Sequence, residues 1–175
     1  GLQIYDITDR ENITSIGTYD TPGSARGVVL SLDEKTAFVP DYTSYQLQII
    51  DVTDPTNPSL LSTFPENGFF DVAMDAALSS DGKTLHIVDG STLINVDVSD
   101  PANPELLGST STAYDTSDAY IGGFANSLVL SADGAIAYVD SANYGLIIVD
   151  VSDLSSPRVI SSLALGIINY RAGAS

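Results

Sequence analysis

Short runs of alternating apolar and polar residues mark the chain, and one such run occurs four times. Each copy begins with Leu, continues through β-branched residues and ends in Asp-x-Thr/Ser-Asp. The copies occupy residues 2–9, 47–54, 93–100 and 146–153. A period-two alternation rich in β-branched residues is typical of a half-buried β-strand. We therefore expect the same strand and the same following turn at four places, spaced 45, 46 and 53 residues apart.

A second run, Leu-Ser-x-Asp followed by an apolar stretch, occurs three times between copies of the first. Its copies occupy residues 30–39, 78–87 and 130–139, and the last two contain Asp-Gly. Asp-Gly between two β-rich segments is a strong signal for a hairpin. With the apolar stretch before each Leu-Ser and the one after each Asp-x-Thr/Ser-Asp, every unit contains four short strands. Four strands in roughly 40–50 residues are typical of a β-propeller blade.

The predicted fold is therefore all-β. It is a β-propeller of about four blades, three complete and one split between the chain ends, or a fragment of a larger propeller. Residues 1–175 form a single repeat domain in this interpretation, with segments 1–20 (a half blade), 21–66, 67–112, 113–165 and 166–175 (a closing strand). The closing strand either joins the first segment in a ring, continues into a longer propeller, or leaves a broken blade that a neighbouring copy completes. Open strand edges invite such pairing.

Two of the runs, Leu146–Asp153 and Leu47–Pro55, resemble the LVIVD repeat, and the similarity extends over nearly the whole chain. This resemblance implies the β-propeller fold of a family of bacterial and archaeal surface or secreted proteins. It implies no catalytic residues, because that family has none in common. The third unit departs from the regular pattern through an insertion at residues 113–120, which is rich in Asp, Ser and Thr.

The charge of the chain restricts its partners. It has 23 acidic and 6 basic residues and a net charge of −17. Because phosphate would be repelled over most of the surface, we expect no nucleic-acid partner and no attraction to anionic membranes. No apolar run approaches the roughly 20 residues of a membrane-spanning helix. The chain has no Cys and one His, which excludes disulfides, thiolate metal sites and His-pair metal sites.

Single residues give few candidates for chemistry. His86 is the one conventional general base, but the repeat places it in the same position as Phe38 and Tyr138, so we interpret it as a packing residue. Most Asp residues fall in predicted turns, where carboxylates accept hydrogen bonds from nearby backbone N–H groups. The recurring Asp at the end of each first run, beginning with Asp6, is expected to cap a strand end in the same way.

Two further candidates concern a metal site and a glycosylation site. Asp115 and Asp118 lie in the insertion beside hydroxyl side chains, a donor set that suits a hard cation such as calcium. No Asp-x-Asp-x-Asp-Gly calcium loop is present elsewhere in the chain. Asn12 begins an Asn-Ile-Thr sequon for N-glycosylation. We expect no cofactor apart from calcium at the insertion.

These observations predict that the protein is not an enzyme. The first hypothesis is a non-catalytic extracellular or cell-surface module with a structural or interaction role, whose partners are proteins, including further copies of itself. High acidity suits surroundings rich in salt or cations, where counter-ions screen self-repulsion. A second hypothesis is a filament subunit joined by strand exchange at the open blade. A third is an enzyme or small-ligand receptor that uses the central channel of the propeller.

Overall fold

The computed structural model describes residues 1–65, 73–113, 125–141 and 145–164, and in these residues the chain consists of strands, turns and loops. Their strands are β1 (Leu2–Asp6), β2 (Thr14–Tyr19), β3 (Val29–Leu30), β4 (Thr36–Asp41), β5 (Gln46–Asp51), β6 (Ser59–Phe64), β7 (Ala73–Leu78), β8 (Thr84–Asp89), β9 (Thr92–Asp97), β10 (Glu105–Ser111), β11 (Ala125–Leu130), β12 (Ile136–Ser141), β13 (Gly145–Asp150) and β14 (Arg158–Ala164).

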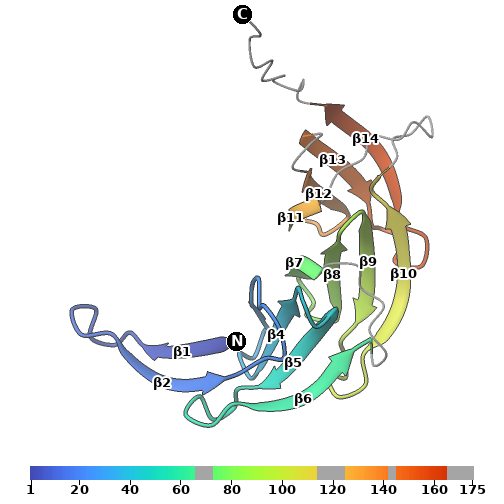
Figure 1. Cartoon of the computed structure of the whole chain (residues 1–175). Coiled ribbons are helices and arrows are strands. Elements are labelled where there is room, and N and C mark those ends of the chain that lie inside the picture. The colour runs from blue at the N-terminus through green and yellow to red at the C-terminus, as the bar shows by residue number, and fades with distance from the viewer. Residues whose placement is uncertain (66–72, 114–124, 142–144, 165–175) are drawn as a thin grey trace, which may run out of the picture.

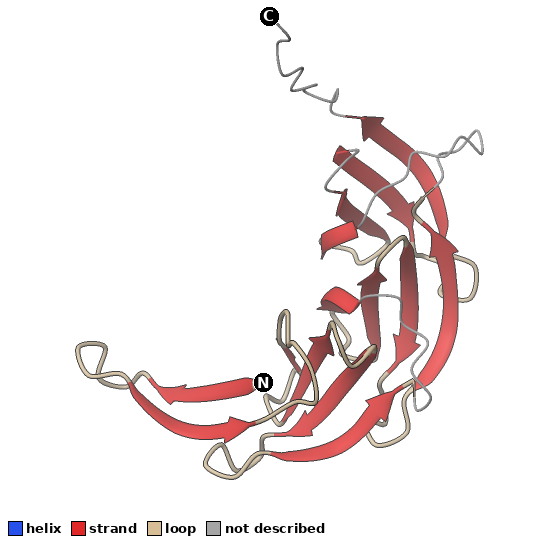
Figure 2. Cartoon of the chain, in the orientation of Figure 1, coloured by secondary structure: helices blue, strands red, loops and turns tan. Residues whose placement is uncertain are grey.

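The strands form antiparallel sheets, and each sheet is made of consecutive strands. We name β3–β6 the first blade, β7–β10 the second blade, β11–β14 the third blade and the two-stranded sheet β1–β2 the half blade. The sheets follow one another around an arc, with β7 and β11 on its inner side and β6 and β10 on its outer side (Figure 1). Figure 2 shows the same arc built from strands and loops. This arrangement confirms the predicted all-β propeller.

The hairpin turns follow from the Leu-Ser-x-Asp runs. Gly82 and Gly134 have φ of +73°, a conformation that costs Gly little. In the second blade the Ser79 hydroxyl donates to Asp81 Oδ1, and it accepts the backbone N–H of Thr84 at 2.9 Å. The same pattern recurs in the hairpins of the first and third blades. A short polar sequence thus supplies the hydrogen bonds that close each hairpin. This is why the hairpins can be predicted from the local sequence.

The core lies between neighbouring sheets. Phe38, Leu47 and Ile49 of the first blade belong to one buried cluster with residues of the second blade such as Leu85 and Ile87. A second cluster joins the second and third blades. A third cluster joins the first blade to the half blade, where Leu2, Ile4 and Tyr19 pack against buried first-blade residues. Each blade therefore buries both of its faces only where another blade lies on each side.

Two predictions about domain organisation stay predictions. The proposed closing strand, residues 166–175, lies outside the described residues. The division of residues 1–175 into blade segments of a single domain is likewise not tested. A further observation concerns membranes: in the described part of the chain, no helix is long and apolar enough to cross a bilayer.

Candidate functional site

The half blade corresponds to the last two strands of a complete blade. The register between β1 and β2 shifts between Ile4 and Tyr5. The same irregularity recurs between the third and fourth strands of every complete blade, at Ile49/Ile50, at Leu106/Gly108 and at Ile148/Val149. β1 is thus the equivalent of β5, β9 and β13. In the described residues, the half blade lacks the two inner strands that the complete blades possess.

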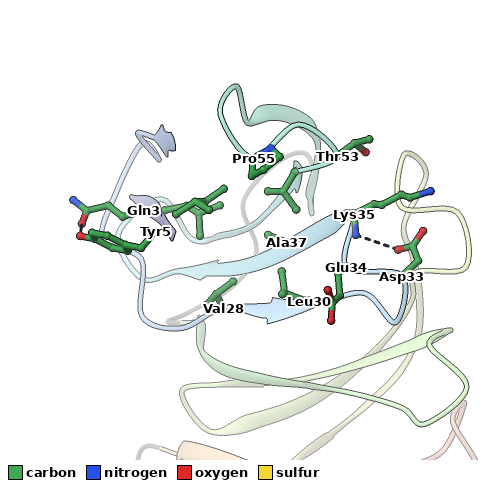
Figure 3. A pocket seen from close by; sticks show the side chains of 13 residues that line it. Gln3, Tyr5, Val28, Leu30, Asp33, Glu34, Lys35, Ala37, Thr53 and Pro55 are labelled. Atoms are coloured by element: carbon green, nitrogen blue, oxygen red, sulfur yellow. Dashed lines mark hydrogen bonds between the residues drawn. The ribbon is translucent and has the colours of Figure 1, made fainter. Parts of the chain in front are cut away.

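An apolar groove lies beside the open edge of β1. In the described residues β1 pairs with β2 alone, so its other edge has no strand neighbour. The groove has a volume of about 590 Å³ and is lined by Leu2 and Ile4 of β1 and by Val28, Leu30 and Ala37 of the first blade. Figure 3 shows Tyr5 and Gln3 on one side of it and Val28 and Leu30 on the other. Asp33, Glu34 and Lys35 also line it, together with the polar residues Gln3 and Thr53, so charged and polar groups border the apolar surface.

Exposure at equivalent positions shows what is missing from the groove. Val28 is 52% exposed, whereas its equivalents Ala76 and Leu128 are 7% and 4% exposed. Leu30 is also exposed, while the matching Leu78 and Leu130 pack against buried clusters between blades. Sequence type does not account for the difference, because all these residues are apolar. The face of the first blade is open where the inner strands of a preceding blade would lie.

The other end of the arc is open in the same manner. Tyr138 of the third blade is 37% exposed, while Phe38 and His86 at the same position are 1% exposed. Val129 on β11 is exposed as well. Ile148 is half-buried, although its first-blade equivalent Ile49 is fully buried. Both ends of the described arc therefore present apolar faces that the interior blades bury against a neighbour.

His86 lies between the second and third blades and is buried, as its repeat position predicts. Its Nδ1 is 2.8 Å from Asn95 Oδ1, and Asn95 Nδ2 donates to the carbonyl of Leu154 in the third blade at 2.9 Å. Because the Asn95 amide group donates to Leu154, its oxygen accepts and His86 Nδ1 carries the proton. Burial lowers the pKa of His86, and the hydrogen bond to Asn95 counters this only in part.

The sequence interpretation missed Asn95. The register pairs His86 with Asn95 on neighbouring strands, where the first blade pairs Phe38 with Ile49. One blade has thus replaced an apolar cross-strand pair by a polar one. The signal was present in the repeats, because both positions become polar in the same unit. This polar pair could be found in the sequence only by comparing both positions across the repeats at the same time.

The Asp residues of the turns have local structural roles. Asp33, Asp81 and Asp133 each accept a hydrogen bond from the Ser hydroxyl two residues before them. The Asp residues at the strand ends accept the backbone N–H two residues after them; they are Asp6, Asp51, Asp97 and Asp150. In all seven the side-chain hydrogen bond is the largest cause that lowers the pKa of the carboxyl. The expectation of capping carboxylates is confirmed.

The candidates for metal and carbohydrate stay predictions. Asp115 and Asp118 lie outside the described residues. Within the part of the chain that is described, no group of three or more His, Asp or Glu side chains is placed to hold a metal ion. Asn12 is exposed in the turn between β1 and β2, and its amide donates to Asp9 Oδ2 at 3.2 Å. Its glycosylation is not tested.

Comparison with known proteins identifies the repeat. The family model for the LVIVD repeat matches residues 22–65, 73–112 and 122–164. No curated protein matches the chain. A protein from Lactobacillus plantarum has a similar structure, with a TM-score of 0.78 at 18% identity over 93% of this chain and 50% of its own. The Swd1 β-propeller domain from Myceliophteria thermophila gives 0.67 at 14% identity over 93% and 52%.

The similar structures include enzymes. The periplasmic gluconolactonase PpgL from Pseudomonas aeruginosa matches with a TM-score of 0.72 at 18% identity, over 94% of this chain and 47% of its own. The prediction that the protein is not an enzyme is therefore wrong as an inference from its architecture. A propeller without a recognisable catalytic motif in its repeats can still carry catalysis, since function lies in sites placed on the fold. The chain spans about half the length of these solved structures.

Proposed function

Because this chain belongs to the LVIVD-repeat family, we propose that it is an extracellular or cell-surface module with a structural and interaction role, joined to further propeller repeats through the open faces of its end blades. One observation carries this proposal. Apolar positions that are buried between blades are exposed at both ends, as Val28 at 52% against Leu128 at 4% illustrates. Contiguous apolar surface of this kind marks sites of protein interaction.

Burial of apolar side chains, which holds the interior blades together, would also favour association through these end faces. Full burial of a Val or Leu side chain contributes roughly 1.5–3 kcal/mol. Val28 and Leu30 at one end and Val129 and Tyr138 at the other are all exposed. Because these side chains are 37–63% exposed, covering each with a neighbouring blade would contribute about half of that amount.

The location outside the cell is proposed from charge. A net charge of −17 on 175 residues makes the chain repel itself at low ionic strength, and dissolved cations screen this repulsion. Protease added to intact cells that produce the protein tests this part directly. Rapid loss of the protein from intact cells is expected. Cleavage seen only after cell lysis would contradict an outside location.

The interaction role is tested by mass in solution. Light scattering over a concentration series in salt should show a mass that rises above that of one chain. A variant with Leu30→Lys and Tyr138→Lys should remain monomeric, because each substitution places a charge in an end face. A control with Leu106→Lys and Ile13→Lys changes net charge equally at exposed positions away from those faces. The proposal is contradicted if the unmodified chain stays monomeric at every concentration.

The filament alternative is favoured by the position of the two faces. They lie at opposite ends of the arc and differ in sequence, so contact between copies would be head-to-tail (Figure 1). Such contacts either close into a ring or continue as a fibre. Negative-stain images of the associated protein distinguish the two outcomes.

A further inference from the structure

We propose that the open edge of β1 binds a β-hairpin from a further LVIVD-type repeat, which supplies the two inner strands that the half blade lacks in the described residues. This inference rests on the proposed function, and it adds the kind of segment that binds and its register. It concerns one end of the arc, where a strand edge and an apolar groove lie side by side. The complete blades of the same chain provide the template.

The register follows from that template. In the first blade Phe38 pairs with Ile49 and Pro40 pairs with Leu47 across β4 and β5. Ile4 and Leu2 are the equivalents of Ile49 and Leu47, as the shared strand irregularity shows. The incoming strand should therefore place its Phe38-like residue opposite Ile4. The pairing is antiparallel, as it is in every described sheet.

The groove specifies an apolar side chain at that position. Phe38 belongs to the cluster that contains Ala76 and Leu85 of the second blade. The first-blade equivalents of these residues are Val28 and Ala37, which line the groove. A large apolar residue opposite Ile4 would therefore pack onto Val28 and Ala37 in the way that Phe38 packs onto the next blade. The groove continues an interface that is already formed farther out, where Leu2 and Ile4 contact the first blade.

A free apolar ligand would fit the groove less well than a strand. Such a ligand would cover Val28 and Leu30 but leave the backbone N–H and C=O groups of the β1 edge without protein partners. Unpaired backbone groups are costly once they are removed from water, and an exposed strand edge is a template for another strand. A hairpin satisfies both requirements, because it carries backbone groups and apolar side chains together. The solved structures, in which this chain covers 47–52% of the length, leave room for such a repeat in the fold.

The first experiment uses a dye-labelled peptide of residues 25–45, the β3–β4 hairpin with its following turn, at low concentrations of the whole chain. Saturable binding by fluorescence anisotropy is expected. Val28→Asp should weaken binding at least tenfold, whereas Val129→Asp, with the same charge change at the opposite end, should alter it less than twofold. A Phe38→Asp version of the peptide should bind at least tenfold more weakly. Unlabelled peptide should displace the labelled peptide at a lower concentration than the unlabelled whole chain does. A whole chain that displaces it as strongly as the unlabelled peptide would identify a second copy as the occupant and overturn the proposal.

A second experiment removes the cost of ordering a free peptide. A copy of residues 25–45 is fused directly before Gly1, where it repeats the natural connection from Tyr45 into the next strand. The fusion should raise the melting temperature by at least about 4 °C over a fusion whose added copy has Phe38→Asp, a shift that corresponds to only about 1–2 kcal/mol. Amide hydrogen exchange of Leu2–Asp6 should slow at least tenfold, because these amides gain a strand neighbour.

The outcomes separate the inference from the proposed function. A fusion that changes neither the melting temperature nor the exchange of β1 overturns the hairpin site. If light scattering still shows association through the Tyr138 end in that case, the interaction role stands without this site. If the peptide fails to bind but the fusion protects β1, the hairpin fits the edge and the proposal holds. If the peptide binds but the amides of Leu2–Asp6 exchange as fast in the complex as in the free chain, the peptide lies elsewhere, and the proposal is overturned.

Discussion

Replacement of His86 by Phe tests the polar pair of His86 and Asn95, which the second blade buries against the third. The repeat alone predicts that Phe is accommodated, since Phe38 occupies the same position in the first blade. The structure adds Asn95, whose side chain is fully buried and whose Oδ1 lies 2.8 Å from His86 Nδ1. His86→Phe leaves that oxygen buried without its donor. An unsatisfied buried polar atom costs about 1–3 kcal/mol, so we expect destabilisation of this size, or roughly 3–9 °C in melting temperature.

A second substitution separates the polar pair from simple packing. His86→Phe combined with Asn95→Ile recreates the apolar pair of Phe38 and Ile49. This double variant should recover most of the lost stability, because both polar partners are removed together. The recovery is incomplete by about 0.5–1.5 kcal/mol, since the carbonyl of Leu154 loses its donor Asn95 Nδ2. Denaturant unfolding of the four proteins in the cycle should give a coupling energy within about 0.5–3 kcal/mol.

The dependence on pH gives an independent readout. Burial lowers the pKa of His86 in the folded protein, so the unfolded chain, where His titrates near 6.5, binds the proton more readily. The stability that His86 contributes is therefore complete above pH 6.5 and decreases as the pH falls toward the folded pKa. Stability of the unmodified protein should decrease below pH 6.5 relative to His86→Phe. Equal stability of the two proteins at pH 8, or zero coupling in the cycle, would refute the reasoning.

Three other perturbations test separate features. Gly108→Ala should destabilise the protein in thermal unfolding, because its Cβ would lie 2.6 Å from the backbone oxygen of Leu154. Acid should weaken the turns: hydrogen bonds lower the pKa of Asp81 and its equivalents, so their stabilisation is present above about pH 3.8 and is lost as the pH falls through the folded pKa. Asp81→Asn should flatten a circular-dichroism titration in that range. Asp115→Asn with Asp118→Asn should abolish most of any calcium-dependent rise in melting temperature, and an equal rise with sodium chloride at matched ionic strength would leave only screening.

The sequence by itself determined the local structure of each blade. The Leu-Ser-x-Asp run contains within six residues every group that closes its hairpin, including the Ser79 hydroxyl and the Asp81 carboxylate. The same holds for Asp51, which accepts the backbone N–H of Thr53. Because these interactions connect residues at most a few positions apart, they can be read from a short pattern. Repetition of the pattern then predicted the blade and the propeller.

The tertiary structure decided which of these equivalent positions are buried and which are exposed. Val28 and Leu128 are both apolar and occupy the same place in the repeat, yet only Val28 is exposed. Asn95 is explained by Leu154, which is 59 residues away in the chain. The repeat pattern determines the structure of each blade but does not determine what packs against the face of that blade. Burial depends on that neighbour, so the open groove and the hydrogen bond from Asn95 to Leu154 emerge only when the blades are placed side by side.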